Sequence, residues 1–364
     1  MITTNINNID GKKRVLIAPL DWGLGHATRC VPIITAFLKQ GYEVFAAGEK
    51  AIALLLQQEF PSIQILPLAG YNIQYSKNKK GFAFKMLTQI PSILKSINRE
   101  NIWLQNCIEQ YKIDIVVSDN RYGLHSKKAT TIFITHQLHI QTGNSFLDKI
   151  VQRINYKYIN KFDSCWVPDI EGSFSLADAL SHPTVLPKTN VKYVGILSRV
   201  QKYNVDKLID VAVILSGPEP QRTIFENIIF KQIENSNLKI VVARGILDNV
   251  DATIFTNKNI TVINHLPSGE ISKLIQAAKT VVARSGYSTI MDIATLQQPA
   301  IFVPTLGQTE QMYLAKYLSE KNYCTATSQH SFDLHAEVEK ISKLKLENYP
   351  SNNAALLEAA IADL

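Results

Sequence analysis

The chain alternates short runs of β-branched and other apolar residues with longer helical stretches, and it does so in two successive series. Such alternation predicts parallel strands connected by helices, which is the pattern of a doubly wound α/β sheet. The expected strands are 15–19, 43–47, 63–66, 113–118, 131–135, 164–167 and 192–195 in the first series and 211–215, 239–243, 261–263, 280–283 and 300–303 in the second. Because the pattern restarts, we expect two Rossmann-like domains that face each other across a cleft.

A polar, strand-poor segment from Gly195 to Asp206 separates the two series. It predicts an N-terminal domain over residues 1–197 and a C-terminal domain over residues 206–348. Residues 349–364 are expected to form a C-terminal helix that packs back on the N-terminal domain. A length of 364 residues suits two domains of ordinary size.

Composition narrows the class of protein. The net charge of +7 suits a nucleic acid, an anionic membrane or a phosphate-bearing ligand. Nucleic-acid binding is not expected, since outside residues 71–103 no compact Lys/Arg cluster carries interleaved aromatic residues.

The apolar runs are far shorter than the roughly 20 residues of a bilayer span. With its polar N-terminal stretch, the chain is expected to be cytoplasmic. The four cysteines lack metal-ligand spacing, so no metal site is expected.

The loop after the first strand, Asp21–Arg29, is rich in glycine. Gly23 and Gly25 would let backbone amides approach a ligand closely, and the start of the following helix favours an anion. The loop also comes near the dinucleotide fingerprint, with Glu49 as the ribose-binding acid, so an NAD site is a rival interpretation. Thr28 in place of the third glycine argues against that site.

His26 and Asp21 of the same loop are expected to face the cleft. A histidine there could take a proton from an acceptor hydroxyl. The alternative is a histidine that only hydrogen-bonds the loop backbone. Two other loops at strand ends, 118–121 and 135–137, would border an acceptor; they include Asp119 and His136.

Three loops of the second series follow strands and carry ligand-binding side chains. Ser216 and Gly217 offer donors, and Arg222 adds a cation for phosphate, although the Pro-Glu-Pro sequence between them also simply starts a helix. Another of the three loops follows the expected strand 300–303. It leads into a helix that begins near Glu310 and Gln311, whose side chains could bind sugar hydroxyls.

The most informative stretch is Val281–Asp292, a strand that runs into a Ser-Gly turn and a helix. Helix-start amides and nearby hydroxyls would bind a diphosphate without a metal. Asp292 could accept hydrogen bonds from ribose, or be an ordinary exposed helix acid. The predicted diphosphate-binding residues are Arg284, Ser285, Gly286, Ser288 and Thr289.

The Gly23–His26 motif, the 284–292 stretch, Pro299–Pro304 and Glu310-Gln311 occur in the order typical of one known family. Together they resemble glycosyltransferase family 28, nucleotide-sugar enzymes of the GT-B fold that include the peptidoglycan lipid-intermediate N-acetylglucosaminyltransferase and plant galactolipid synthases. The resemblance implies that Ser285-Gly286 binds diphosphate, Asp292 binds ribose and Gln311 contacts the donor sugar. It aligns His265 and Leu266 with the loop that reads the base. The family pattern has Glu where Asp292 stands and Gln where Glu310 stands.

The resemblance implies an inverting, metal-independent transfer from a nucleotide diphosphate sugar, UDP-linked, to a hydroxyl acceptor such as a lipid or cell-envelope glycan precursor. His26 is the first candidate base, followed by Asp119, with Asp21 and His136 as weaker candidates. No cofactor is expected beyond the donor substrate. A nucleotide-sugar 2-epimerase of the same fold, or a non-catalytic nucleotide-sugar-binding protein, remains the alternative.

Residues 71–103 form an insertion in which lysines alternate with apolar residues. This composition suits either an anionic membrane surface, which would make the protein peripheral to the inner face of a membrane, or an ordinary helix with its apolar side on the core. The lysines are Lys77, Lys79, Lys80 and Lys85, and the apolar residues include Phe82, Phe84, Met86 and Leu87.

Overall fold

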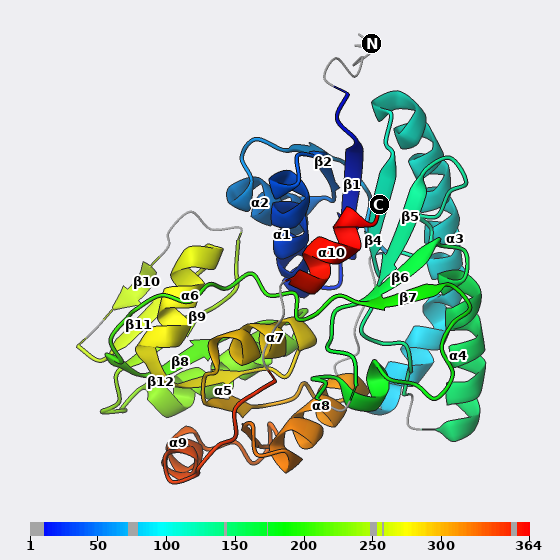
Figure 1. Cartoon of the computed structure of the whole chain (residues 1–364). Helices are drawn as coiled ribbons and strands as arrows, with labels where there is room; N and C mark the ends of the chain where they lie inside the picture. Colours follow the sequence, from blue (N-terminus) through cyan, green and yellow to red (C-terminus); the bar gives the residue numbers. More distant parts are fainter. Residues whose placement is uncertain are drawn as a thin grey trace.

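The computed structural model describes residues 11–71, 79–141, 144–172, 174–247, 253–256, 258–350 and 355–364. The chain forms two seven-stranded sheets, each with helices on both faces (Figure 1). The predicted pair of doubly wound α/β domains is therefore confirmed.

The N-terminal sheet has the order β3-β2-β1-β4-β5-β6-β7, and all its strand pairs are parallel. Its central strands β1 and β4 are buried along their whole length, which explains their continuous apolar sequence. The strands are β1 (Arg14–Pro19), β2 (Glu43–Ala47), β3 (Gln64–Leu66), β4 (Ile115–Asp119), β5 (Thr130–Ile134), β6 (Ser164–Val167) and β7 (Asn190–Tyr193). The helices are α1 (Leu24–Lys39), α2 (Lys50–Glu59), α3 (Lys79–Tyr111) and α4 (Ser145–Ile159), with a short 3-10 turn at Asp178–Leu180.

The C-terminal sheet has the order β10-β11-β9-β8-β12-β13-β14. Only the pairing of β10 with β11 is antiparallel among its described strands. The strands are β8 (Ile209–Ile214), β9 (Ile240–Ala243), β10 (Thr253–Thr256), β11 (Ile260–Ile263), β12 (Ala278–Ala283), β13 (Ala300–Phe302) and β14 (Thr325–Ala326). The helices are α5 (Gln221–Ile233), α6 (Ser268–Ala277), α7 (Tyr287–Leu296), α8 (Thr309–Glu320), α9 (Leu334–Ser342) and α10 (Ala355–Ala362).

The structure adds elements that the sequence pattern did not reveal. Helix α4 begins where the Asn144 side chain accepts hydrogen bonds from the amides of Phe146 and Leu147, at 3.0 and 3.2 Å. Helix α1 begins at Leu24, inside the segment Asp21–Arg29 that was interpreted as a loop, and Gly23 takes a φ of 79° just before it. His26 consequently lies in the first turn of a helix and not in a loop.

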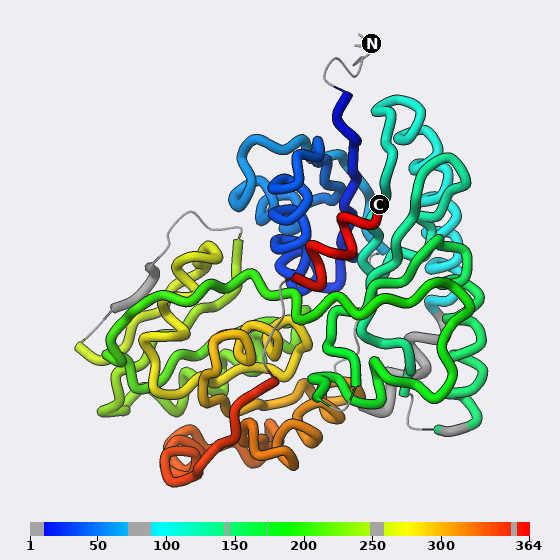
Figure 2. Tube along the Cα trace, in the orientation of Figure 1, coloured from blue at the N-terminus to red at the C-terminus, as the bar shows by residue number. Residues whose placement is uncertain are grey.

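Helix α10 returns from the C-terminal domain to lie against α1. Figure 2 shows the C-terminal segment, in red, beside helix α1, in blue. The Gln40 side chain donates to the carbonyl of Glu358 at 3.0 Å, and Lys192 pairs with Asp363 at 2.7 Å. Ile361 is fully buried in the core that includes α1. The last helix thus ties the two ends of the chain together.

No helix within the described residues is long and apolar enough to cross a membrane. The predicted basic side chains Lys77, Lys79, Lys80 and Lys85 lie outside the residues or side chains that the structure describes, so that prediction stays untested at these positions. The backbone of 79–111 forms α3.

Candidate active site

Two helix N-termini meet between the sheets. The hydroxyl of Ser288, in the first turn of α7, donates to the carbonyl of Gly25 in the first turn of α1 at 2.7 Å. Gly23 and Gly286 stand at the N-cap positions, where no side chain accepts from the helix amides, and neither first turn carries an acid. Since helix N-termini carry partial positive charge, this junction suits an anionic ligand.

Asp119, the last residue of β4, lies next to this junction and is fully buried. His26 Nδ1 is 3.1 Å from Asp119 Oδ1. Arg29, one turn along α1 from His26, reaches the same carboxylate with Nε, at 3.1 Å from Oδ2, and with Nη2. Burial alone would raise the pKa of Asp119, but Arg29 and His26 outweigh it and lower the pKa to about 2. Asp119 is therefore ionised at neutral pH and orients the imidazole of His26.

His136, which follows β5, connects this group to the other domain. Its Nδ1 lies 3.1 Å from Arg29 Nη1, and its Nε2 lies 2.7 Å from Glu310 Oε1 in the first turn of α8. Its ring stacks on Tyr287 with the ring centroids 4.1 Å apart. Burial lowers the pKa of His136 despite the carboxylate of Glu310. We therefore treat His136 as a neutral imidazole that joins the two domains.

The Ser285-Gly286 turn lies directly beside Gln311. The Ser285 hydroxyl donates to the backbone carbonyl of Gln311 at 2.8 Å, and the Gln311 side-chain oxygen accepts from the amide of Thr305 at 2.8 Å. Because the Ser285 proton is used inside the protein, the amides of α7 are the stronger candidates to donate to a phosphate. The partly exposed Ser288 and Thr289 lie in the same helix turn.

Asp292 lies one turn further along α7 and contacts the segment between the domains. Its Oδ1 accepts from the hydroxyl of Ser198 at 2.6 Å, and its Oδ2 is 3.9 Å from Nε of Arg199. Nε and Nη1 of Arg199 and Nε2 of the nearby His265 are buried without a hydrogen-bond partner in the part of the chain that the structure describes. Burial, reinforced by the charge of Arg199, lowers the pKa of His265 to about 4. Buried polar atoms without partners are costly, so this cluster is prepared to bind a polar ligand.

The sequence analysis missed Ser198 and Arg199. Both stand in a segment that was interpreted only as a linker. The signal that could have found this part of the site was Arg199 itself, a cationic side chain in a connection with few strand-forming residues. Leu266 was predicted together with His265. It is partly buried and lies in the loop after β11, as expected.

The other predicted donor-site arginines are engaged elsewhere. Arg222 pairs with Glu219 and Glu226, which neutralise it. The guanidinium of Arg284 donates to Gln329 at 2.6 Å and lies 4.2 Å from the centre of the Phe225 ring. Burial lowers the pKa of Arg284 to about 10. Both arginines brace the loops after their strands, and their contact with phosphate stays a prediction.

The remaining predicted residues lie in both domains, Ser216 and Gly217 in the C-terminal one and Asp21 in the N-terminal one. Ser216 and Gly217 stand at the end of β8, where Gly217 has a φ of 106°. Asp21 does not join His26, because its carboxylate accepts from the backbone amide of Tyr71 at 3.0 Å. Asp21 therefore holds the backbone of Tyr71 at the entrance to α1, and its weaker candidacy as a base stays a prediction.

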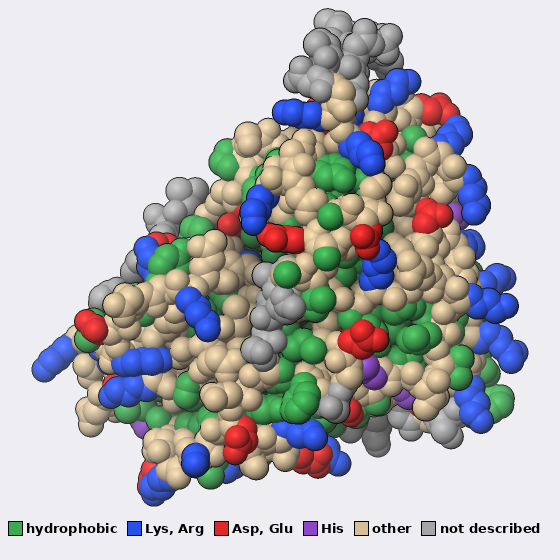
Figure 3. All heavy atoms as spheres, viewed as in Figure 1, with side chains coloured by type: hydrophobic (Ala, Val, Ile, Leu, Met, Phe, Trp, Pro, Cys, Tyr) green, Lys and Arg blue, Asp and Glu red, His purple; other side chains and the backbone are tan. Residues whose placement is uncertain are grey.

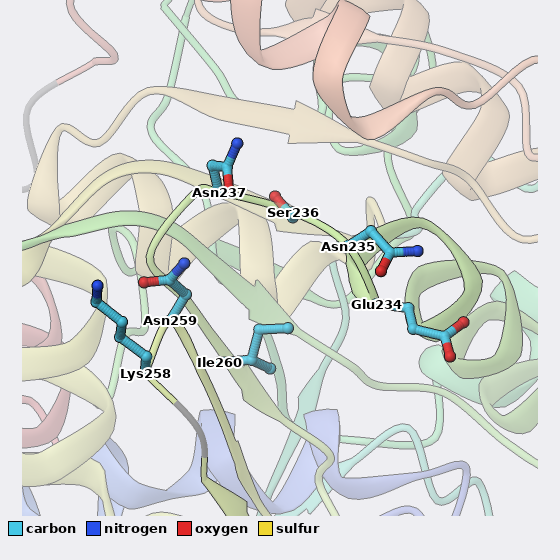
Figure 4. Close-up of a pocket in the computed structure, with 7 residues that line it drawn as sticks. All are labelled: Glu234, Asn235, Ser236, Asn237, Lys258, Asn259 and Ile260. Atoms are coloured by element: carbon cyan, nitrogen blue, oxygen red, sulfur yellow. The ribbon is translucent and has the colours of Figure 1, made fainter.

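A surface hollow of about 430 Å³ lies elsewhere on the C-terminal domain (Figure 4). Its lining residues precede β9 and β11, so it stands at the amino ends of these strands. The predicted site residues stand at the carboxyl ends. The lining includes Glu234, Asn235, Lys258 and Asn259 and none of the predicted site residues.

Comparisons with known proteins identify the class. Residues 219–363 match the glycosyltransferase family 28 C-terminal domain. The chain is 25% identical over 354 residues to the UDP-N-acetylglucosamine--N-acetylmuramyl-(pentapeptide) pyrophosphoryl-undecaprenol N-acetylglucosamine transferase of Histophilus somni, covering 92% of this chain and 88% of that protein. The glycotransferase of kitacinnamycin superposes with a TM-score of 0.64 at 12% identity, covering 96% of this chain and 94% of that one. Acinetobacter baumannii MurG superposes with a TM-score of 0.51 at 15% identity, covering 96% and 93%.

Two doubly wound domains that meet at their strand ends, with these relatives, define a glycosyltransferase of the GT-B fold. The C-terminal domain of the chain matches the C-terminal domain of glycosyltransferase family 28, and the similarity to the Histophilus somni transferase extends over most of both chains. The resemblance inferred from the sequence motifs is thereby confirmed.

Replacing Asp119 with Asn should destabilise the fold by about 3–5 kcal/mol, because Arg29 would keep its buried charge without a carboxylate partner. The pKa of Asp119 is depressed in the folded state, so its contribution is fully present above about pH 4 and is lost as the pH falls toward 2. Denaturant unfolding at several pH values measures this, and the Asn variant should lack that part of the acid dependence. Asp363→Asn, which alters an exposed ion pair, is the control. Equal unfolding free energies for both variants would contradict the assignment.

Proposed function

We propose that the protein transfers a sugar from a UDP-linked donor to a hydroxyl of a lipid-linked acceptor, with inversion and without a metal. The observation that carries this proposal is the position of the His26–Asp119 pair beside the uncapped N-terminus of α7. The Histophilus somni relative is named for UDP-N-acetylglucosamine and an undecaprenol-linked acceptor, and the match spans most of both chains. This supports the same donor and acceptor classes here.

In the proposed reaction an acceptor oxygen attacks the anomeric carbon of the sugar while the bond from that carbon to the diphosphate breaks. The acceptor proton passes to Nε2 of His26, whose Nδ1–H donates to Asp119. The diphosphate leaves with its negative charge against the amides at the start of α7. Attack opposite to the leaving group inverts the anomeric carbon. The positive helix end supplies the stabilisation that a divalent cation gives in other transferases.

The nucleoside would extend from the diphosphate along α7. Asp292 lies one turn beyond the helix start, where its carboxylate could accept from ribose hydroxyls once Ser198 releases it. His265 and Arg199 hold buried polar atoms without partners beside it. These two side chains are proposed to contact the base and ribose.

Gly286→Ala tests the diphosphate site. Gly286 has a φ of −70°, which any residue adopts, and an added Cβ would meet only the Gln311 amide nitrogen, at 3.9 Å. The variant should therefore fold normally yet bind UDP at least about tenfold more weakly, because the methyl group obstructs phosphate approach to the helix amides. Titration calorimetry with UDP in the presence of EDTA measures this and also tests metal independence.

The matched control for that experiment is Gly269→Ala in the first turn of α6, where an added Cβ would lie 3.5 Å from the Tyr203 hydroxyl. It should bind UDP like the original protein. Unchanged UDP affinity in Gly286→Ala, or binding that EDTA abolishes, would count against the proposed site.

His26→Ala should lower the rate of UDP release from UDP-N-acetylglucosamine by about 100-fold or more, while UDP affinity changes little. The reason is that the hydrogen-bond partners of His26 are Asp119 and Arg29, on the acceptor side. Steady-state kinetics and calorimetry on one preparation separate the two quantities. An unaltered rate removes His26 from the role of base. Formation of the 2-epimer from the donor alone would favour the epimerase alternative.

Helix α4 supports a membrane-bound acceptor. Four of its apolar side chains are exposed: Phe146 at 70%, Leu147 at 48%, Ile150 at 44% and Ile154 at 52%. The exposed Lys149, Arg153 and Lys157 alternate with them. Figure 3 shows basic side chains along the edge of the molecule where α3 and α4 run. Exposed apolar residues that alternate with basic residues fit an anionic membrane surface. We propose that this face, here called the α4 face, lies on the cytoplasmic side of a membrane.

The double variant Phe146→Ser/Ile150→Ser should bind vesicles of phosphatidylcholine and phosphatidylglycerol at least about tenfold more weakly, since two apolar anchors are lost. Vesicle flotation measures binding. Leu344→Ser, which removes a side chain that is 48% exposed in the other domain, should bind normally. The α4 face is wrongly assigned if both variants float equally well, or if the unaltered protein does not float.

A further inference from the structure

The acceptor-side base is connected to the donor domain by a continuous line of side chains. It runs from Asp119 to Arg29, from Arg29 to His136, and from His136 to Glu310. Three of these four residues belong to the N-terminal domain, and Glu310 belongs to the C-terminal one. Sequence separation of 174 residues between His136 and Glu310 makes this a contact that only the assembled domains provide.

Arg29 is the centre of this line. It is only 2% exposed, and its three guanidinium nitrogens all have partners. Nε and Nη2 grip the carboxylate of Asp119 as a fork, and Nη1 faces Nδ1 of His136. A fork of this kind fixes the plane of the carboxylate, which a lysine could not do while also reaching a second partner.

The donors and acceptors along the line have a fixed direction. A guanidinium can only donate, so Nδ1 of His136 must accept and carries no hydrogen. The hydrogen of the neutral ring is therefore on Nε2, from where it donates to Glu310 at 2.7 Å. Glu310 thus selects the form of His136 that can accept from Arg29.

The same logic governs His26. Its Nδ1 is 3.0 Å from Arg29 Nη2 and 3.1 Å from Asp119 Oδ1. If Arg29 donates to Nδ1 of His26, the single hydrogen of the neutral ring must be on Nε2, and Nε2 then cannot take a proton from an acceptor. If Nδ1–H donates to Asp119, Nε2 is free. The contact of Arg29 Nη1 with His136 fixes one edge of the guanidinium, and with it the position of Nη2 between Asp119 and His26.

We propose that Arg29 is a positioning residue and that Glu310, acting through His136 and Arg29, makes the His26 base competent only while the donor domain is closed onto it. This rests on the proposed function of His26. Glu310 stands next to Gln311, which contacts the Ser285-Gly286 turn. Donor binding at that turn and the state of the base are therefore linked through direct contacts. Closure would switch on proton acceptance at the moment the donor is sequestered from water.

A direct test needs no substrate. Nitrogen NMR of protein labelled with ¹⁵N-histidine distinguishes the two neutral imidazole forms, and His136→Asn assigns the signal. The expected result is a His136 ring protonated on Nε2 only, at neutral pH. Protonation on Nδ1, or on both nitrogens, would overturn the proposal. This outcome is independent of UDP binding, so it is distinguishable from a failure of the proposed glycosyl transfer.

A double-mutant cycle tests the function of the line. Glu310→Ala should lower the rate of UDP release from UDP-N-acetylglucosamine by about tenfold to 100-fold, with UDP affinity within about twofold, because the base is misplaced while the donor site is intact. Glu310→Gln, whose amide oxygen can still accept from His136, should recover part of the loss. Arg29→Lys keeps a cation on Asp119 but releases His136.

In the Arg29→Lys background, Glu310→Ala should cost nothing further, because residues that act through one another are not additive. Thermal melting of every variant controls for folding. Equal losses from Glu310→Ala with Arg29 and with Lys at position 29 would show that Glu310 acts on the donor sugar alone, and would refute the coupling.

Discussion

The site depends on one buried ion pair, the fork between Arg29 and Asp119. Removing two charges from water is expensive, and the cost is recovered only when the geometry is good and the remaining hydrogen-bonding groups have partners. Both conditions hold here, since the carboxylate also receives His26 and the guanidinium also reaches His136. The pair therefore determines where both histidines stand. Because Asp119 ends the central strand β4 and Arg29 lies in α1, a central strand and the helix that follows β1 position the site.

The contact between the domains has a different character. It includes single hydrogen bonds from C-terminal side chains to N-terminal backbone: Tyr287 donates to the carbonyl of Pro168 at 2.8 Å, and Ser288 donates to that of Gly25 at 2.7 Å. Each such bond contributes about 1 kcal/mol. Buried apolar residues of both domains also belong to one core cluster in which α1 lies against α7, whereas two further clusters belong to one sheet each. Opening of the domains to admit a nucleotide would therefore separate apolar side chains as well as hydrogen bonds.

The sequence predicted the fold well where burial is symmetrical. Central strands covered on both faces have continuous apolar sequences, so β1, β4 and β12 were placed within two residues of their observed bounds. The edge strands β10 and β14 were missed. One is antiparallel and the other has two residues, so neither leaves a clear pattern.

The site could be predicted residue by residue but not as an arrangement. His26, Asp119, His136 and Glu310 were each predicted from strand ends and helix starts, yet nothing local indicates that His136 meets Glu310. Arg29 is a helix residue whose role depends on a partner 90 positions away. Arg199 belongs to a connection whose sequence carries no strand or helix pattern. Contacts of this range become visible only when both sheets are assembled.

The arrangement also explains the departure from the family pattern at Glu310. A carboxylate in the place of an amide needs a hydrogen-bond donor, and Nε2 of His136 supplies it. The Gln311 side-chain oxygen is held by the amide of Thr305, which leaves its N–H groups to donate. Two neighbouring side chains in the first turn of α8 therefore offer opposite functions, one an acceptor and one a donor. In the proposed transfer such a pair would suit adjacent sugar hydroxyls, because each hydroxyl both donates and accepts.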